Sequence, residues 1–142
     1  MSVFALRRWF CGLLLLAAAC DGPRPAALTA SPAALKSLEG TWLASHEENH
    51  GDTLVYRPNT YSFPPTRGRT GFAIGPFGRF EQFDIALTDG LTARPGTWTA
   101  DGANHLRIHL ADGQAPDYTL EIISAERNVM RLRRLYTLPS ER

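Results

Sequence analysis

The segment His46-Glu47-Glu48-Asn49-His50 has the residue types and the spacing that metal-dependent hydrolysis uses. On an α-helix, residues i and i+4 share one face, so the imidazoles of His46 and His50 would reach a single zinc ion while Glu47 activated the metal-bound water to cleave a peptide bond. On an extended strand the two histidines lie about 13 Å apart and do not reach one ion without a sharp bend. The chemistry therefore depends on the secondary structure of these five residues.

The flanking sequence favours a connection between strands over a helix. Gly51-Asp52 follows the motif directly and leads into Thr53-Leu54-Val55-Tyr56, a β-type run, so a helix here would be unusually short. No third zinc ligand is apparent, because Glu81, His105 and His109 each belong to a segment that we interpret as strand or turn. We expect a polar hairpin and no bound metal or cofactor, with a small zinc metallopeptidase as the alternative function.

A second group of residues with binding chemistry is Tyr61, Arg67 and Arg69, in a segment that contains Pro64-Pro65. Adjacent prolines exclude a central strand, so the segment is predicted to be a loop. Two guanidinium groups separated by one glycine offer donors to a carboxylate or phosphate beside an aromatic ring. These three are our candidate ligand-binding residues, and an ordinary solubilising loop is the alternative. The sequence has no Gly-x-Ser-x-Gly elbow and no phosphate-binding glycine loop, and we expect no enzymatic activity.

Short alternating runs closed by turn residues must position these side chains. The run His105-Leu106-Arg107-Ile108-His109-Leu110 alternates strictly between Asp101-Gly102 and Asp112-Gly113, as a half-buried strand between tight turns should. The other expected strands are Thr41 to Glu47, Leu54 to Arg57, Phe72 with Ile74, Phe83 with Ile85 and Leu87, Thr97 to Ala100, Tyr118 with Leu120 and Ile122, and Met130 with Leu132. About eight such strands predict an all-β fold, an antiparallel up-and-down barrel, with a sandwich as the alternative.

The triplet Gly40-Thr41-Trp42 opens the first expected strand, and Gly96-Thr97-Trp98 repeats it within the domain. The triplet resembles the Gly-x-Trp start of lipocalins and related calycin barrels, a resemblance that extends from Leu38 to Leu135. The stretch from Tyr56-Arg57-Pro58 through Arg67 to Phe72 is similar to small bacterial lipocalin-like lipoproteins, which supports the fold and implies no particular activity. A barrel of this type would bind a small apolar or amphipathic molecule in its lumen.

The resemblance also implies roles at the floor of the barrel. In those families the tryptophan closes the floor, and an arginine near the last strand lies over it. Trp42 would be that tryptophan, and Arg131, Arg133 or Arg134 would stack on it by a cation–π contact, with Arg133 as our candidate.

The first 19 residues have the layout of an export signal. Arg7 and Arg8 give a positive start, and the apolar run Trp9 to Ala19 is shorter than the roughly 20 residues of a membrane-spanning helix. Small residues directly before Cys20 resemble the lipobox of bacterial lipoproteins, in which the cysteine thiol carries a diacylglycerol and becomes the new N-terminus. We expect lipidation at Cys20, with ordinary cleavage and a secreted soluble protein as the alternative.

After the signal, residues 20–37 are predicted to be a flexible tether rich in proline and alanine, and residues 38–138 a single domain. The chain has 15 basic and 14 acidic residues, so it lacks the concentrated positive charge that nucleic-acid binding needs. We expect a lipid-anchored protein of the bacterial cell envelope, facing the periplasm in a Gram-negative cell. Its expected partners are that membrane and either a small apolar or amphipathic ligand or another envelope protein.

The lipid anchor is testable by removing the thiol that would carry it. The Cys20→Ser variant should lose metabolic labelling with a fatty acid and move from the membrane fraction to the soluble envelope fraction. Membrane association that is unchanged in this variant would contradict the anchor.

Overall fold

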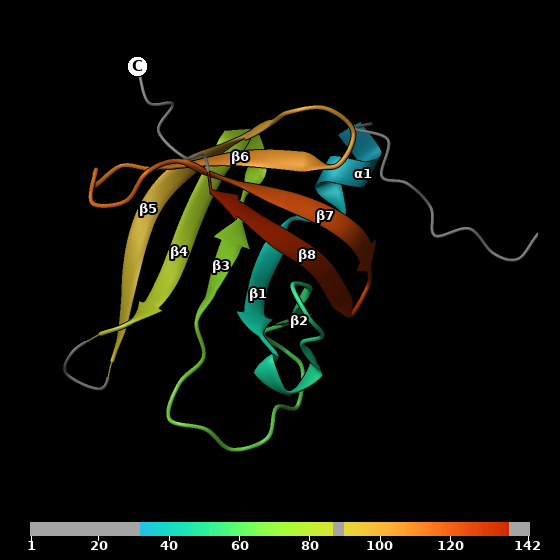
Figure 1. The fold of residues 1–142 in the computed structure, drawn as a ribbon, viewed down its shortest axis with the longest axis vertical. Helices are drawn as coiled ribbons and strands as arrows, with labels where there is room; N and C mark the ends of the chain where they lie inside the picture. Colours follow the sequence, from blue (N-terminus) through green and yellow to red (C-terminus); the bar gives the residue numbers. More distant parts are fainter. Residues whose placement is uncertain (1–31, 87–89, 137–142) are drawn as a thin grey trace, which may run out of the picture.

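A computed structural model describes residues 32–86 and 90–136 of the chain, and Cys20, the export signal and Leu87 lie outside the described residues. The elements form a closed β-barrel with a short helix at one end (Figure 1). They are α1 (Pro32–Lys36), β1 (Gly40–Ala44), the 3₁₀ helix η1 (His46–Glu48), β2 (Leu54–Pro58), β3 (Gly71–Ile74), the 3₁₀ turn η2 (Pro76–Gly78), β4 (Arg79–Ile85), β5 (Leu91–Ala100), β6 (His105–Leu110), β7 (Tyr118–Glu126) and β8 (Val129–Tyr136). No helix among these residues is long and apolar enough to cross a membrane.

The eight strands close in the order β1-β2-β8-β7-β6-β5-β4-β3, and every neighbouring pair is antiparallel. The predicted all-β, eight-stranded antiparallel barrel is therefore confirmed. Strands β3 to β8 follow one another around the barrel. In a strict up-and-down barrel β2 would pair with β3, but here β1 lies between these two strands. The hairpin of β1 and β2 thus joins β3 on one side and β8 on the other.

The centre of the barrel is filled by apolar side chains. Within a strand, alternate residues point to opposite faces, so each strand turns one set of residues into the lumen. The five largest fully buried side chains are Phe72, Ile108, Leu120, Met130 and Leu132. Each contributes about 1.5–3 kcal/mol to stability by leaving water. The apolar faces predicted for β6, β7 and β8 are the faces that the structure buries.

Strand β4 turns the opposite face inward from the one its apolar alternation indicates. Phe80 and Gln82 are buried, whereas Phe83 is half-buried and Ile85 is 59% exposed. In this register Phe80 stacks on Phe72, with 5.7 Å between the ring centroids. Because side chains alternate with a period of two, burying Phe80 also brings Gln82 and Asp84 to the lumen side and leaves Ile85 outside.

The short helix α1 lies at one end of the barrel, which we call the floor (Figure 1). Trp42 is near the start of β1, the strand that follows α1. Its side chain is 4% exposed, and its indole Nε1 donates a hydrogen bond to the carbonyl oxygen of Leu38 at 2.9 Å. This bond ties the connection that follows α1 to the first strand. The second tryptophan of the repeated triplet, Trp98, is half-buried and donates from Nε1 to the carbonyl oxygen of Gly75 at 3.0 Å.

Arg133 does not lie over Trp42, so this part of the floor prediction is wrong. Its guanidinium lies outside the barrel and pairs with Asp52 at 2.9 Å and with Glu121 at 3.5 Å. The reason is the alternation of β8, which turns Leu132 and Arg134 inward and the residue between them outward. The cation–π contacts of the described residues involve tyrosine and phenylalanine rings, and none involves a tryptophan.

The floor can be tested through Trp42. Truncation to alanine should lower the free energy of unfolding by about 3–5 kcal/mol, because it removes a buried aromatic ring and leaves a cavity. The Trp42→Phe variant keeps most of the apolar contact and loses the bond to Leu38, and we expect it to cost less than the alanine variant. Denaturant unfolding followed by circular dichroism measures both, and an alanine variant as stable as the wild type would exclude a closed floor.

Candidate functional site

A cavity of about 440 Å³ is lined by Ala44, the last residue of β1, and by η1, whereas α1 precedes the other end of β1. Its wall combines residues of β1, η1, β2, β4 and β8 with the first residue of β3 and three loop residues, Asn49, Asp52 and Thr70. The volume lies in the range of known small-molecule sites, roughly 300–1,000 Å³. Below it the lumen is packed with side chains, so the cavity is a cup at the mouth of the barrel, closed at its base.

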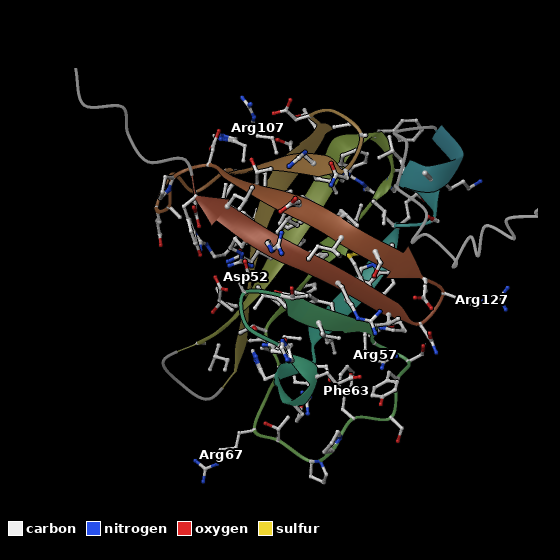
Figure 2. All side chains as sticks on the ribbon, turned by 45° about the vertical axis from the view of Figure 1, so that its right-hand side comes forward. Asp52, Arg57, Phe63, Arg67, Arg107 and Arg127 are labelled. Atoms are coloured by element: carbon white, nitrogen blue, oxygen red, sulfur yellow. The ribbon has the colours of Figure 1, made fainter. Side chains whose placement is uncertain are left out.

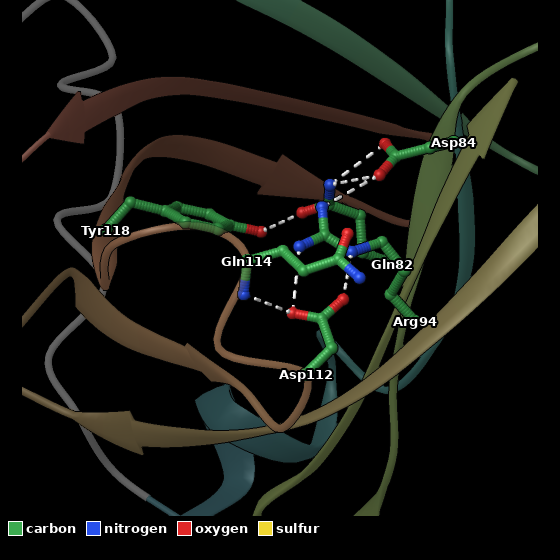
Figure 3. Close-up of polar contacts among 6 residues, drawn as sticks. All are labelled: Gln82, Asp84, Arg94, Asp112, Gln114 and Tyr118. Carbon is green, nitrogen blue, oxygen red and sulfur yellow. Dashed lines mark hydrogen bonds and ion pairs between the residues drawn. The ribbon is translucent and has the colours of Figure 1, made fainter.

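A chain of polar contacts crosses the barrel at this level (Figure 3). Tyr118 donates from its hydroxyl to Gln82 Oε1 at 2.6 Å, and Gln82 donates from Nε2 to both carboxylate oxygens of Asp84 at 2.9 Å. Arg94 then joins Asp84, at 3.1 Å, to Asp112, at 2.6 Å. The hydrogen bonds to Arg94 lower the pKa of Asp112 to about 2. The carboxylate of Asp112 is therefore ionised, and protein donors already bind both carboxylates of this chain.

Arg134 enters the same region from β8 and has a different environment. Its guanidinium lies over the ring of Tyr118, at 4.7 Å from the centroid, and it lines the cavity with Tyr56 and Tyr136. Its Nε is buried and has no hydrogen-bond partner among the described residues. Burial raises the pKa of Tyr118 to about 12 and that of Tyr56 above its usual value, so both phenols are neutral near pH 7. The positive charge of Arg134 is thus surrounded by neutral rings.

The segment from His46 to His50 lies in the short polar connection between the antiparallel strands β1 and β2, as the sequence predicted. The 3₁₀ helix ends at Glu48, and Asn49 is extended, so the two histidines do not share the face of one α-helix. Glu47 accepts two hydrogen bonds from Arg69, at 2.6 and 3.0 Å, which lower its pKa to about 2. In the described ranges, no three His, Cys, Asp or Glu side chains gather closely enough to hold a metal ion.

The predicted binding residues Tyr61, Arg67 and Arg69 do not converge on one site. Arg67 is exposed and points away from the barrel (Figure 2), and Tyr61 stacks edge-on against Phe63 with ring centroids 5.0 Å apart. Arg69 is buried, with a side-chain exposure of 6%, and none of the three lines the mouth cavity. The structure therefore does not bring the three residues together as one site.

Arg69 instead holds the long loop between β2 and β3 against the barrel. Besides Glu47, its guanidinium donates to the carbonyl oxygens of Ala44, at 2.9 Å, and Pro64, at 3.3 Å, and it lies 4.4 Å from the centroid of Phe63. The N–H donors of Arg69 that we had expected to bind a ligand thus bind groups of the protein instead. Of the five residues in the histidine motif, His46 and Asn49 line the cavity.

The sequence interpretation missed Gln82, Asp84 and the inward position of Arg134. The signal for the first two is the alternation of Phe80, Gln82 and Asp84, which competes with the stronger apolar alternation of Phe83 and Ile85.

Comparison of the chain with protein-family models, with curated proteins and with solved structures finds no match.

The two loop arginines form a matched pair of variants. Arg69→Ala should lower the free energy of unfolding by about 1–3 kcal/mol, because the buried carbonyl of Ala44 loses its donor. Arg67→Ala makes the same substitution at an exposed position and should change the free energy of unfolding by no more than about 0.5 kcal/mol. Urea unfolding of the two variants measures the difference, and equal stabilities would contradict a structural role for Arg69.

Proposed function

We propose that the protein binds a small amphipathic molecule in the cavity at the mouth of its barrel. The observation that carries this proposal is a cup of about 440 Å³ with an arginine and two tyrosines in its wall, above a packed core. Protein pockets for small molecules commonly combine an apolar lining with a few convergent polar groups. The fold and the open cup together fit a lipocalin-like binding protein.

The two kinds of wall indicate how such a molecule would lie. Ala44, Leu54, Val55 and Phe83 supply apolar contact, while Arg134 belongs to the polar part of the wall. Because the centre of the barrel is filled, the ligand occupies the mouth and does not thread the lumen. These features support a short molecule with one apolar part and one polar end.

We further propose that the protein does this in the cell envelope, with Cys20 carrying the lipid. The export-signal layout before Cys20 and the small residues that resemble a lipobox support this location. A lipid at Cys20, followed by the tether, would leave the barrel free to meet ligands in the aqueous compartment beside the membrane.

Filling the cup tests the binding function. The neutral probe N-phenyl-1-naphthylamine becomes fluorescent in an apolar site, and we expect the purified barrel domain to bind it. Leu54→Trp places a larger side chain in the cavity wall and should weaken probe binding at least tenfold, whereas Leu135→Trp, on an exposed part of β8, should leave it unchanged. Exciting the probe directly avoids interference from the added tryptophan.

Two results would contradict the proposal. One is a wild-type protein that does not bind the probe, and the other is a Leu54→Trp variant that binds it as tightly as the wild type. Circular dichroism of both leucine variants checks that the barrel is folded.

A further inference from the structure

We propose that the polar end of the ligand is a single carboxylate and that Arg134 binds it. This inference rests on the proposed binding function and specifies the chemical class of the ligand.

Most described arginines already have a carboxylate partner or lie in water. Those that pair with Asp or Glu are Arg57, Arg69, Arg94, Arg107, Arg131 and Arg133. Those without such a pair but exposed to solvent are Arg67, Arg79 and Arg127. Among residues 32–86 and 90–136, Arg134 alone is half-buried and has no ion pair to a carboxylate.

The immediate surroundings of Arg134 leave its charge uncompensated. The guanidinium lies over the ring of Tyr118 and interacts with the side chains of Tyr136 and Tyr56 by hydrogen bonding. These partners carry no negative charge, because burial keeps the phenols of Tyr56 and Tyr118 neutral, and the hydroxyl of Tyr118 already donates to Gln82. The buried Nε–H has no acceptor. A buried polar group without a partner costs free energy, and a buried charge costs more. Because Arg134 lines the cavity, an anion bound there would supply the missing negative charge.

The geometry favours a carboxylate over other anions. A guanidinium presents its donors as a planar fork that a carboxylate matches with two parallel hydrogen bonds. Asp84 also lines the cavity, and together with Arg94 and Asp112 it makes a group with one net negative charge. A doubly charged phosphate would be repelled by this group more strongly than a singly charged carboxylate. The apolar part of the wall then receives a hydrocarbon body.

The cavity also argues against a cationic ligand. The acidic residues of the cavity wall are Asp52 and Asp84. Asp84 already accepts from Gln82 and Arg94, and Asp52 pairs with Arg133. Arg134 would repel an ammonium group in the same space. A ligand with a carboxylate therefore satisfies Arg134 and leaves the contacts of Asp84 unchanged.

Competition among three molecules of one chain length tests the head group. Octanoate, octanamide and octylamine share a similar hydrocarbon body and differ in charge, and each is titrated against bound N-phenyl-1-naphthylamine. On the wild-type protein we expect octanoate to displace the probe at a concentration at least tenfold lower than either of the others, the effect of a charge-assisted hydrogen bond. In Arg134→Gln this preference should fall to less than threefold.

Another arginine of β8 provides the matched control. Arg131→Gln removes the same charge from the same strand, and since neither Arg131 nor its partner Glu126 lines the cavity, it should keep the full preference for octanoate. Equal displacement by octanoate and octanamide on a wild-type protein that binds the probe would overturn the carboxylate inference and leave the binding function standing. A preference for octylamine, or an octanoate preference that survives in Arg134→Gln, would overturn it as well.

A measurement on the wild-type protein covers the case in which Arg134→Gln does not fold. The buried Nε–H of Arg134 should give a protected resonance in a ¹H–¹⁵N spectrum, which the Arg134→Lys variant identifies by its loss. Octanoate should shift this resonance and octanamide should not. A resonance that octanoate leaves unmoved while it displaces the probe would overturn the assignment to Arg134, whereas a protein that binds no probe would refute the proposed function itself.

Discussion

Each strand of the barrel is paired on both sides, and this closure forces each strand to turn one set of alternate residues into the lumen. Neighbours in the sequence therefore have opposite environments. Arg133 lies outside and pairs with Asp52, whereas Arg134 lies inside, over Tyr118. On β4 the same rule buries Gln82 and leaves the apolar Ile85 exposed. The composition of the cavity wall follows from this constraint more than from the local hydrophobicity of any strand.

The lumen divides into two parts with different physical roles. The centre and floor contain packed apolar side chains, including Phe72 and Met130, and Trp42 ties this part to the segment after α1. The mouth contains the polar chain through Gln82, in which the buried groups satisfy one another. A well-packed centre can stabilise a fold that keeps one cation, Arg134, without a local counter-charge. Functional sites in proteins are often the places where such costs are tolerated.

Much of the fold was predictable because alternation is a local signal. The strict pattern of β6 identified both the strand and its buried face, and the strand-type sequence after the histidine motif indicated a short connection. The site was less accessible, because it depends on which strands become neighbours and in which register. Nothing near Arg69 in the sequence indicates that its guanidinium would pair with Glu47, because the two residues are far apart in the chain. The inward position of Arg134 likewise depends on the register of β8 in the closed barrel.

The placement of β1 between β2 and β3 gives the hairpin of β1 and β2 a particular role in folding. The six strands from β3 to β8 pair with their sequence neighbours, so they can form a sheet through local contacts, which assemble quickly. A sheet of these six strands alone would have two unpaired edges, and the hairpin pairs with both of them, at β3 and at β8. Open edges favour aggregation, so docking also protects the chain. The hairpin supplies Ala44 and Tyr56 to the cavity wall. A ligand bound there would therefore stabilise the closed barrel, with the hairpin docked, over any form in which the hairpin is detached.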